Sequence, residues 1–198
     1  MFSPRDDVRL DDLEVIRFAT PDGLTSGSVV LRGAEGELAT IPFDGDDLVS
    51  LPFPEAVRDG LSTGDTLTIE VRDADTRAIS SSATLRVVDA DPKIDAALAR
   101  LFLSMGERQV SLRRLLASNV LVKAGLRSAA FEILLAGLPK GTATPEDLPV
   151  LAGLYRLFEE IDDAATEGYS SSTQLGRRVA QTLKDLPADV TADWVSRD

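Results

Sequence analysis

The chain has 198 residues, of which 43% are apolar and 27% charged, and its net charge is −12. That balance is typical of a globular protein with room for one large domain or two small ones. Cysteine and histidine are both absent, which excludes disulfides, thiolate catalysis, a histidine general base and the commonest transition-metal ligand.

The charge is unevenly distributed along the chain. Residues 1–91 sum to −11, residues 92–140 to +5 and residues 141–198 to −6. The central basic segment either docks against its acidic neighbours within the chain or meets an acidic partner. We expect no nucleic-acid partner, because the acidic flanks would repel phosphate.

The first twelve residues are predicted to be a flexible lead-in, because the segment through Asp12 is too acidic to bury. The start of the chain lacks the basic residues and the apolar run of a secretory signal. The chain as written is therefore predicted to be cytoplasmic, or extracytoplasmic if a leader has been removed. Its apolar runs are all too short to cross a bilayer, so no membrane insertion is expected.

Short apolar alternations separated by Gly, Pro and Asp turns follow this lead-in. They predict six strands, at residues 13–18, 28–32, 37–41, 48–51, 65–72 and 83–87. The clearest is 65–72, where Leu67, Ile69 and Val71 face one way. Half-polar strands at this spacing predict an antiparallel β-sandwich or small barrel over residues 13–90. The resemblance to immunoglobulin-like and fibronectin-like domains is one of pattern only.

A helix-start signal marks the junction, with Asp91 suited to the N-cap position and Pro92 to the first turn. From there apolar residues recur three and four apart, which predicts a helical domain over residues 91–187 and a tail over 188–198. The predicted helices cover residues 94–105, 112–122, 129–138, 147–161 and 175–186. One stripe of the first helix contains Ile94, Leu98, Leu101, Phe102 and Met105. The predicted fold class is α+β, with the sandwich or small barrel followed by a bundle of antiparallel helices.

Small and apolar residues in the helical region resemble the pattern of tetratricopeptide repeats. Similar spacings occur among Leu116–Ala117, Gly125, Ala130 and Leu134, and Ala152–Tyr155 is similar to the opening of a second unit. The usual aromatic near the start of the first helix is missing, with Arg114 in that region, and Leu138–Pro139 ends the helix early. The resemblance implies helical hairpins that recognise peptides or helices in a groove. An ordinary helical hairpin is the alternative.

Motifs of the common enzyme classes are missing from the sequence. The chain has no Walker phosphate loop, dinucleotide fingerprint, nucleophile elbow or S-x-x-K pair. Paired carboxylates are plentiful, so the composition does not exclude a carboxylate-dependent hydrolase, which is a further alternative function. Glu132, on the most apolar helix, is either an acid with a raised pKa or, as we favour, the partner of Arg114 or Arg127.

Acidic turns raise a calcium hypothesis. The weak candidates are Asp44, Asp46 and Asp47 in one predicted loop and Asp73 and Asp75 in another. Loops at one end of a sandwich can gather carboxylate oxygens around calcium, so a calcium- or carbohydrate-binding module is the alternative function. The simpler interpretation is that Asp favours turns, and we expect neither a metal nor a cofactor.

The expected function is non-catalytic. The helical domain is predicted to act as a scaffold or adaptor that presents a basic surface to a protein partner, and complementary charge would favour an acidic one. The candidate contact residues are Arg108, Arg113, Arg114, Lys123, Arg127 and the aromatic Trp194. The sequence leaves the oligomeric state open.

Overall fold

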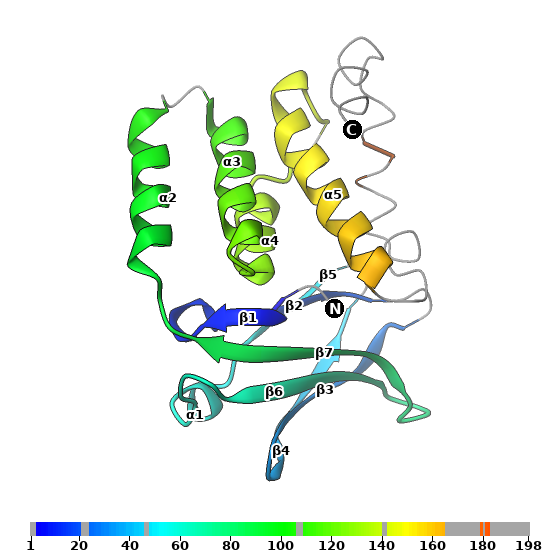
Figure 1. The fold of residues 1–198 in the computed structure, drawn as a ribbon. Helices are drawn as coiled ribbons and strands as arrows, with labels where there is room; N and C mark the ends of the chain where they lie inside the picture. The colour runs from blue at the N-terminus through cyan, green and yellow to red at the C-terminus, as the bar shows by residue number, and fades with distance from the viewer. Residues whose placement is uncertain are drawn as a thin grey trace. The chain divides into compact units, whose positions relative to one another are not determined.

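The fold is mixed α+β. The computed structural model (Figure 1) describes residues 3–20, 24–45, 48–105, 109–139, 142–164, 179 and 181–182. The chain divides into two compact units: the first comprises Met1–Asp91 with Gly125–Ala129, and the second comprises Pro92–Ala124 with the residues from Ala130 onward.

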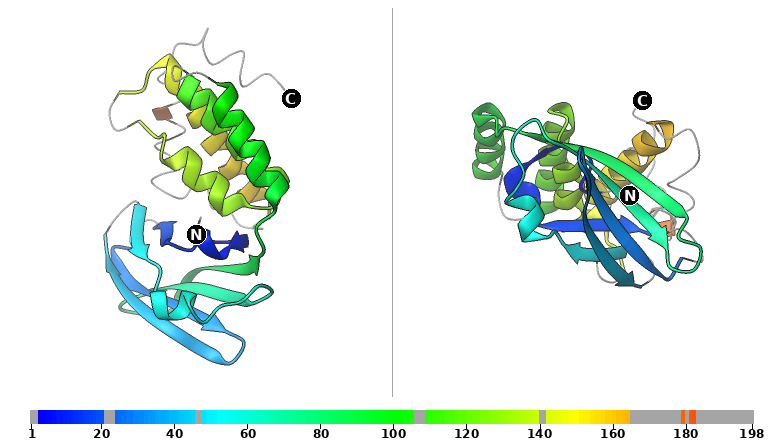
Figure 2. Two further views of the ribbon diagram at one scale, coloured as in Figure 1. Left: turned by 90° about the vertical axis from the view of Figure 1, so that its left-hand side faces the viewer. Right: turned by 90° about the horizontal axis from the view of Figure 1, so that it is seen from below.

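The first unit is built on a five-stranded sheet and a two-stranded sheet. The large sheet has the order β1-β7-β6-β3-β4, and the small sheet pairs β2 with β5. The strands are β1 (Asp6–Arg9), β2 (Val15–Ala19), β3 (Ser26–Gly33), β4 (Gly36–Asp44), β5 (Leu48–Pro52), β6 (Thr66–Asp73) and β7 (Ile79–Val88). A 3-10 helix at Leu10–Asp12 and the short helix α1 (Glu55–Arg58) complete this unit's regular structure in the part of the chain described. Figure 2 shows the long strands β3 and β4 running side by side.

Alternating apolar residues explain the central strands. In β6, Leu67, Ile69 and Val71 are at most 1% exposed, whereas Glu70, between two of them, faces the opposite side of the sheet. Val29 of β3 lies directly opposite Val71 and is also fully buried. A one-residue slip would move these side chains to the other face, so burial fixes the register.

One apolar cluster takes residues from both sheets of the first unit. Ile16 and Phe18 come from β2 and Val49 from β5, and all three pack with the inward residues of the large sheet. The rings of Phe18 and Phe43 meet edge to face, with their centroids 5.0 Å apart and their planes at 82°, a geometry that aromatic quadrupoles favour. The two sheets therefore share a hydrophobic core.

The structure corrects three predictions about this unit. The residues through Asp12 are not a lead-in without structure, since β1 pairs with β7 and Val8 is only 2% exposed. The Asp7 carboxylate accepts two hydrogen bonds from the Arg86 guanidinium opposite, at 2.9 and 2.8 Å, so acidic residues of this segment have a cationic partner. The β1–β7 pairing is parallel, so the predicted sheet of purely antiparallel strands is wrong. The small barrel is also wrong, because the described sheet ends on the different strands β1 and β4.

Residues 125–129 belong to the first unit through a buried serine. Ser128 is 3% exposed. Its Oγ accepts a hydrogen bond from the Arg5 backbone N–H at 2.6 Å and donates one to the Arg5 carbonyl at 2.9 Å. Arg127 adds an ion pair with Asp6 at 3.5 Å. The first unit thus combines two segments that are far apart in the sequence.

The second unit is helical. Its helices are α2 (Pro92–Ser104), α3 (Val110–Lys123), α4 (Arg127–Leu135), whose first residues belong to the first unit, and α5 (Leu148–Ala164). In Figure 1, α3 lies between α2 and α5 and packs against both. The predicted helix at 175–186 falls mostly outside the described residues, as does the predicted tail at 188–198.

Local signals place the helix ends where the sequence predicted them. Helix α2 begins at Pro92. Before α5, the 3-10 helix Pro145–Asp147 has a capping box, in which the Asp147 carboxylate accepts a hydrogen bond from the Thr144 N–H at 2.9 Å. Gly125, which follows α3, has a φ of +81°, a conformation in which a side chain would be strained.

Close packing of α5 depends on a glycine. A Cβ on Gly153 would lie 2.9 Å from side-chain carbons of both Leu115 on α3 and Leu134 on α4. These two leucines are 6% and 1% exposed. The missing side chain therefore lets three helices meet at one point.

No described helix of the chain is long and apolar enough to span a bilayer.

Candidate functional site

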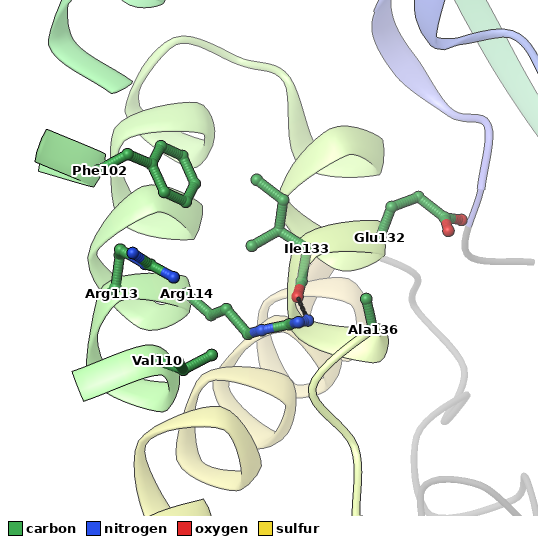
Figure 3. A pocket seen from close by; sticks show the side chains of 7 residues that line it. All are labelled: Phe102, Val110, Arg113, Arg114, Glu132, Ile133 and Ala136. Carbon is green, nitrogen blue, oxygen red and sulfur yellow. Dashed lines mark hydrogen bonds between the residues drawn. The ribbon is translucent and has the colours of Figure 1, made fainter. Parts of the chain in front are cut away.

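A cavity of about 360 Å³ opens between α2, α3 and α4 in the second unit. Its walls are mostly apolar, with two arginines among them. The lining residues, drawn in Figure 3, are Phe102, Val110, Arg113, Arg114, Glu132, Ile133 and Ala136. A volume of this size is within the range of small-molecule pockets, and it is large enough for an anchoring side chain of a protein partner.

Arg113 lies against an aromatic ring. Its guanidinium carbon is 5.1 Å from the centroid of the Phe102 ring, which is a cation–π contact. Among the described residues, nothing accepts a hydrogen bond from the buried Nε of Arg113. Buried donors normally have a partner, so this nitrogen is a polar group with unused hydrogen-bonding capacity at the cavity wall.

Arg114 has a different environment, although it is the next residue. Its Nη1 donates a hydrogen bond to the Ile133 carbonyl at 3.1 Å, drawn as a dashed line in Figure 3. Near the end of α4, the N–H of Gly137 bonds to the Leu134 carbonyl instead of continuing the helical pattern to Ile133. The Ile133 carbonyl is thus one of the acceptors at a helix C-terminus that have no partner within the helix. A cation at this end also interacts favourably with the helix dipole. Arg114 caps α4.

The turn after α4 is shaped around the Arg114 side chain. A Cβ on Gly137 would lie 2.8 Å from Arg114 Cδ and 3.0 Å from Val150 Cγ2. The aliphatic part of the Arg114 side chain is therefore closely packed, and its guanidinium is hydrogen-bonded. Arg114 is a structural part of the wall.

Glu132 lines the cavity without pointing toward the two arginines. Figure 3 shows its carboxylate directed to the side away from Arg113 and Arg114. Arg114 donates to the Ile133 carbonyl, and Arg127 pairs with Asp6. The pairing of Glu132 with Arg114 or Arg127 that we favoured from the sequence stays a prediction.

Two of the apolar residues that line the cavity are partly exposed, Phe102 at 42% and Val110 at 38%. Leu103, the residue after Phe102 in α2, is 88% exposed. None of the residues of α2 is fully buried, although the sequence placed Phe102 on that helix's apolar stripe. We call Phe102, Leu103, Val110 and Arg113 the α2–α3 surface.

The exposure of this surface had a signal in the sequence. Leu101, Phe102 and Leu103 are consecutive, and successive residues of a helix point about 100° apart. Three such residues span about 200°, which is more than a helix at the edge of a bundle can bury. At least one large apolar side chain must therefore face outward, and Leu103 does.

The predicted basic surface is only partly assembled. Arg113 and Arg114 line one cavity. Lys123 is exposed at the last residue of α3, nine residues and about 13 Å along the helix from Arg114. Arg127 belongs to the first unit and pairs with Asp6. The remaining candidates, Arg108 and Trp194, lie outside the described residues.

Among the calcium candidates that the structure describes, Asp73 holds a turn together. One oxygen of Asp73 accepts hydrogen bonds from the N–H groups of Asp75 and Thr76, at 2.9 and 2.7 Å. Bonding by Thr76, first through its backbone, holds the pKa of Asp73 below its ordinary value. In the described part of the chain, no three acidic side chains are grouped so that they could hold a metal ion. Asp44 is within that part, whereas Asp46 and Asp47 lie outside it.

No protein-family model matches the sequence, and a comparison with curated proteins also gives no match. The likeness to tetratricopeptide repeats therefore rests on the residues quoted above.

Proposed function

We propose that this chain is a non-catalytic interaction protein, a scaffold or adaptor whose helical unit holds an acidic segment of another protein on the α2–α3 surface. The observation that supports this most is the cavity of about 360 Å³, which has Arg113 and the half-exposed Phe102 in its wall. Leu103, which follows Phe102 in α2, is 88% exposed. Arginine and large apolar residues around a pocket are typical of the energetic centre of a protein interface. The charge of Arg113 favours an acidic partner over a basic one.

The expected affinity is modest. Covering the 88% exposed Leu103 contributes roughly 1.5 to 3 kcal/mol, and covering Phe102, which is only 42% exposed, contributes about half as much. Association costs at least about 4 kcal/mol in lost translational and rotational freedom. These contributions and one charged hydrogen bond therefore suggest a dissociation constant of about millimolar or weaker for a short peptide. A longer partner segment would bind more tightly.

The proposal includes a finer architecture than the α+β class. The first unit would be a sandwich of the five-stranded and two-stranded sheets, supported by the core that the two sheets share. The second would be a bundle of hairpins similar to tetratricopeptide repeats, supported by the close packing at Gly153. In that arrangement the α2–α3 surface lies at one edge of the bundle, where a partner helix would take the place of a further hairpin.

The experiment is a selection of short random peptides displayed on phage against the immobilised full-length chain. Enriched peptides are synthesised, and their binding is compared for the wild type and two single-site variants. Leu103→Asp changes the most exposed apolar side chain of the α2–α3 surface. Ile79→Asp is the matched control, since Ile79 is a 54% exposed side chain of the first unit.

We expect enriched peptides to combine Asp or Glu with Leu, Phe or Trp. Leu103→Asp should weaken their binding at least tenfold, because it removes apolar contact area and adds like charge against an acidic ligand. Ile79→Asp should change binding less than twofold. Peptides that bind both variants as well as the wild type would contradict the proposed surface, as would a selection that enriches nothing.

A further inference from the structure

We infer that the cavity between α2, α3 and α4 takes an apolar side chain that lies next to a carboxylate, and that Arg113, not Arg114, recognises the carboxylate. This inference rests on the proposed function, to which it adds the chemistry of the anchoring group. It starts from the unequal environments of two adjacent arginines.

Arg113 has donors available at the cavity. Stacking on Phe102 occupies a face of the guanidinium, at 5.1 Å, and leaves the N–H groups in its plane for a ligand. The buried Nε has no acceptor among the described residues. Because the Nε is buried, a carboxylate would accept from the two terminal nitrogens, a paired geometry that arginine forms well. The aromatic ring holds the guanidinium in place before the ligand arrives, so less freedom is lost on binding.

The Arg114 side chain is held in another direction, toward α4. Its guanidinium donates to the Ile133 carbonyl at 3.1 Å, and its Cδ fills the space beside Gly137. In Figure 3 it extends from α3 across to α4. It sets the separation of two walls of the cavity and is a positioning residue.

Apart from Glu132, whose carboxylate points away from the two arginines in Figure 3, the rest of the lining fits the apolar part of such a ligand. Val110, Ile133 and Ala136 present only hydrocarbon side chains, and Figure 3 shows Val110 and Ile133 on either side of the Arg114 stem. A volume of about 360 Å³ is several times that of one phenyl ring, so an aromatic or branched aliphatic side chain can enter together with its flanking carboxylate.

The test uses a pair of small probes that differ only in charge, 3-phenylpropionate and 3-phenylpropanamide. Each is titrated into the isotope-labelled full-length chain, and the dissociation constant is taken from NMR shifts of the Ile133 and Ala136 methyl groups. The measured quantity is the ratio of the two constants. A ratio is insensitive to general loosening of the cavity, because loosening weakens both probes alike.

For the wild type we expect the carboxylate probe to bind about tenfold more tightly than the amide, since a charged hydrogen bond is roughly twice as strong as a neutral one. Arg113→Gln should lower the ratio to about one. Arg114→Gln should weaken both probes and leave the ratio near ten. Lys123→Gln removes an exposed positive charge of the same helix away from the cavity, and should leave both constants unchanged.

Several results would overturn the inference. They are a wild-type ratio of one, a ratio that survives Arg113→Gln in a variant with unaltered methyl spectra, a ratio lost in Lys123→Gln, or no binding of either probe. If Arg114→Gln does not fold, the comparison of Arg113→Gln with Lys123→Gln still decides. Selected peptides that depend on Leu103 while the ratio is one would leave the proposed function standing and remove only the anchoring chemistry. The expected ratios without any selected peptide would instead support the carboxylate site and contradict the protein partner.

Discussion

Ser128 offers the sharpest test of how the first unit is held together. Its Oγ is both acceptor and donor toward the backbone of Arg5, at 2.6 and 2.9 Å. Replacing Ser128 with Ala removes both bonds and leaves an N–H and a carbonyl without this partner. The matched control is Ser118→Ala. Ser118 is equally buried, but its Oγ only donates, at 2.8 Å, to the carbonyl of Leu115 in the same helix.

The two substitutions delete the same atom, so their difference isolates the long-range bonds. A buried donor or acceptor left unsatisfied costs about 1 to 3 kcal/mol, and Ser128→Ala leaves one of each, so the loss lies in the range of roughly 2 to 6 kcal/mol. Water reaches the half-buried Arg5, so the loss should lie near the lower end of this range. Alanine also has a higher helix propensity than serine, which offsets up to about 0.5 kcal/mol of the loss. We expect Ser128→Ala to lose about 2 kcal/mol of local stability, and Ser118→Ala to change stability by less than about 0.5 kcal/mol.

Hydrogen exchange followed by mass spectrometry measures this difference locally. In Ser128→Ala, amides of residues 5–9 should exchange about 30-fold faster, because each 1.4 kcal/mol is a factor of ten. Amides in β3 and β6 should change much less. Equal effects of the two serine substitutions, or faster exchange spread evenly over the sheet, would refute the assignment of a local stabilising role to Ser128.

Two further predictions concern the large sheet. Gly27→Ala should lose about 2 to 4 kcal/mol in chemical denaturation, because the new Cβ would lie 2.1 Å from the Arg72 carbonyl oxygen and must push two paired strands apart. Gly60→Ala is the control, because its Cβ would be no closer than 3.5 Å to the nearest atoms around it. It should change stability by less than about 1 kcal/mol. Equal losses of stability in the two variants would show that the close approach of the strands at Gly27 is not the cause. Glu70→Gln tests how stability depends on pH. The hydrogen bond from Arg72, together with the charges of Arg72 and Arg32, lowers the pKa of Glu70 from its ordinary value of 4.5, although burial acts in the opposite direction. The stability that the Glu70 carboxylate contributes is therefore fully present above pH 4.5 and is lost as pH falls through the lowered pKa. The difference in unfolding free energy between wild type and Glu70→Gln should accordingly shrink from pH 6 to pH 3. A difference that grows on acidification would contradict a lowered pKa.

Much of the local structure follows from the sequence. The alternation of Leu67, Ile69 and Val71 predicted β6, and Asp91 with Pro92 predicted the start of α2. These signals succeed because they depend on neighbours a few residues away. The six predicted strands and the four predicted helices that fall in the described residues are all present, with different end residues.

The long-range partners could not be predicted in the same way. The acidic start of the chain contains a strand because Arg86, 79 positions from Asp7, lies opposite it. Composition predicted a surface of five basic side chains without indicating the surroundings of each. Arg127 pairs with Asp6 in the first unit, and Lys123 is the exposed last residue of α3 in the second. A charge count contains no information about which charge meets which.

The sequence by itself determined the kinds of elements, their order, and the absence of histidine and cysteine chemistry. Only the tertiary structure decided that Arg114 caps a helix while Arg113 stacks on Phe102 beside a cavity. The physical reason is that adjacent helical residues point about 100° apart. Two identical side chains therefore enter different surroundings, and their roles depend on what packing brings to each.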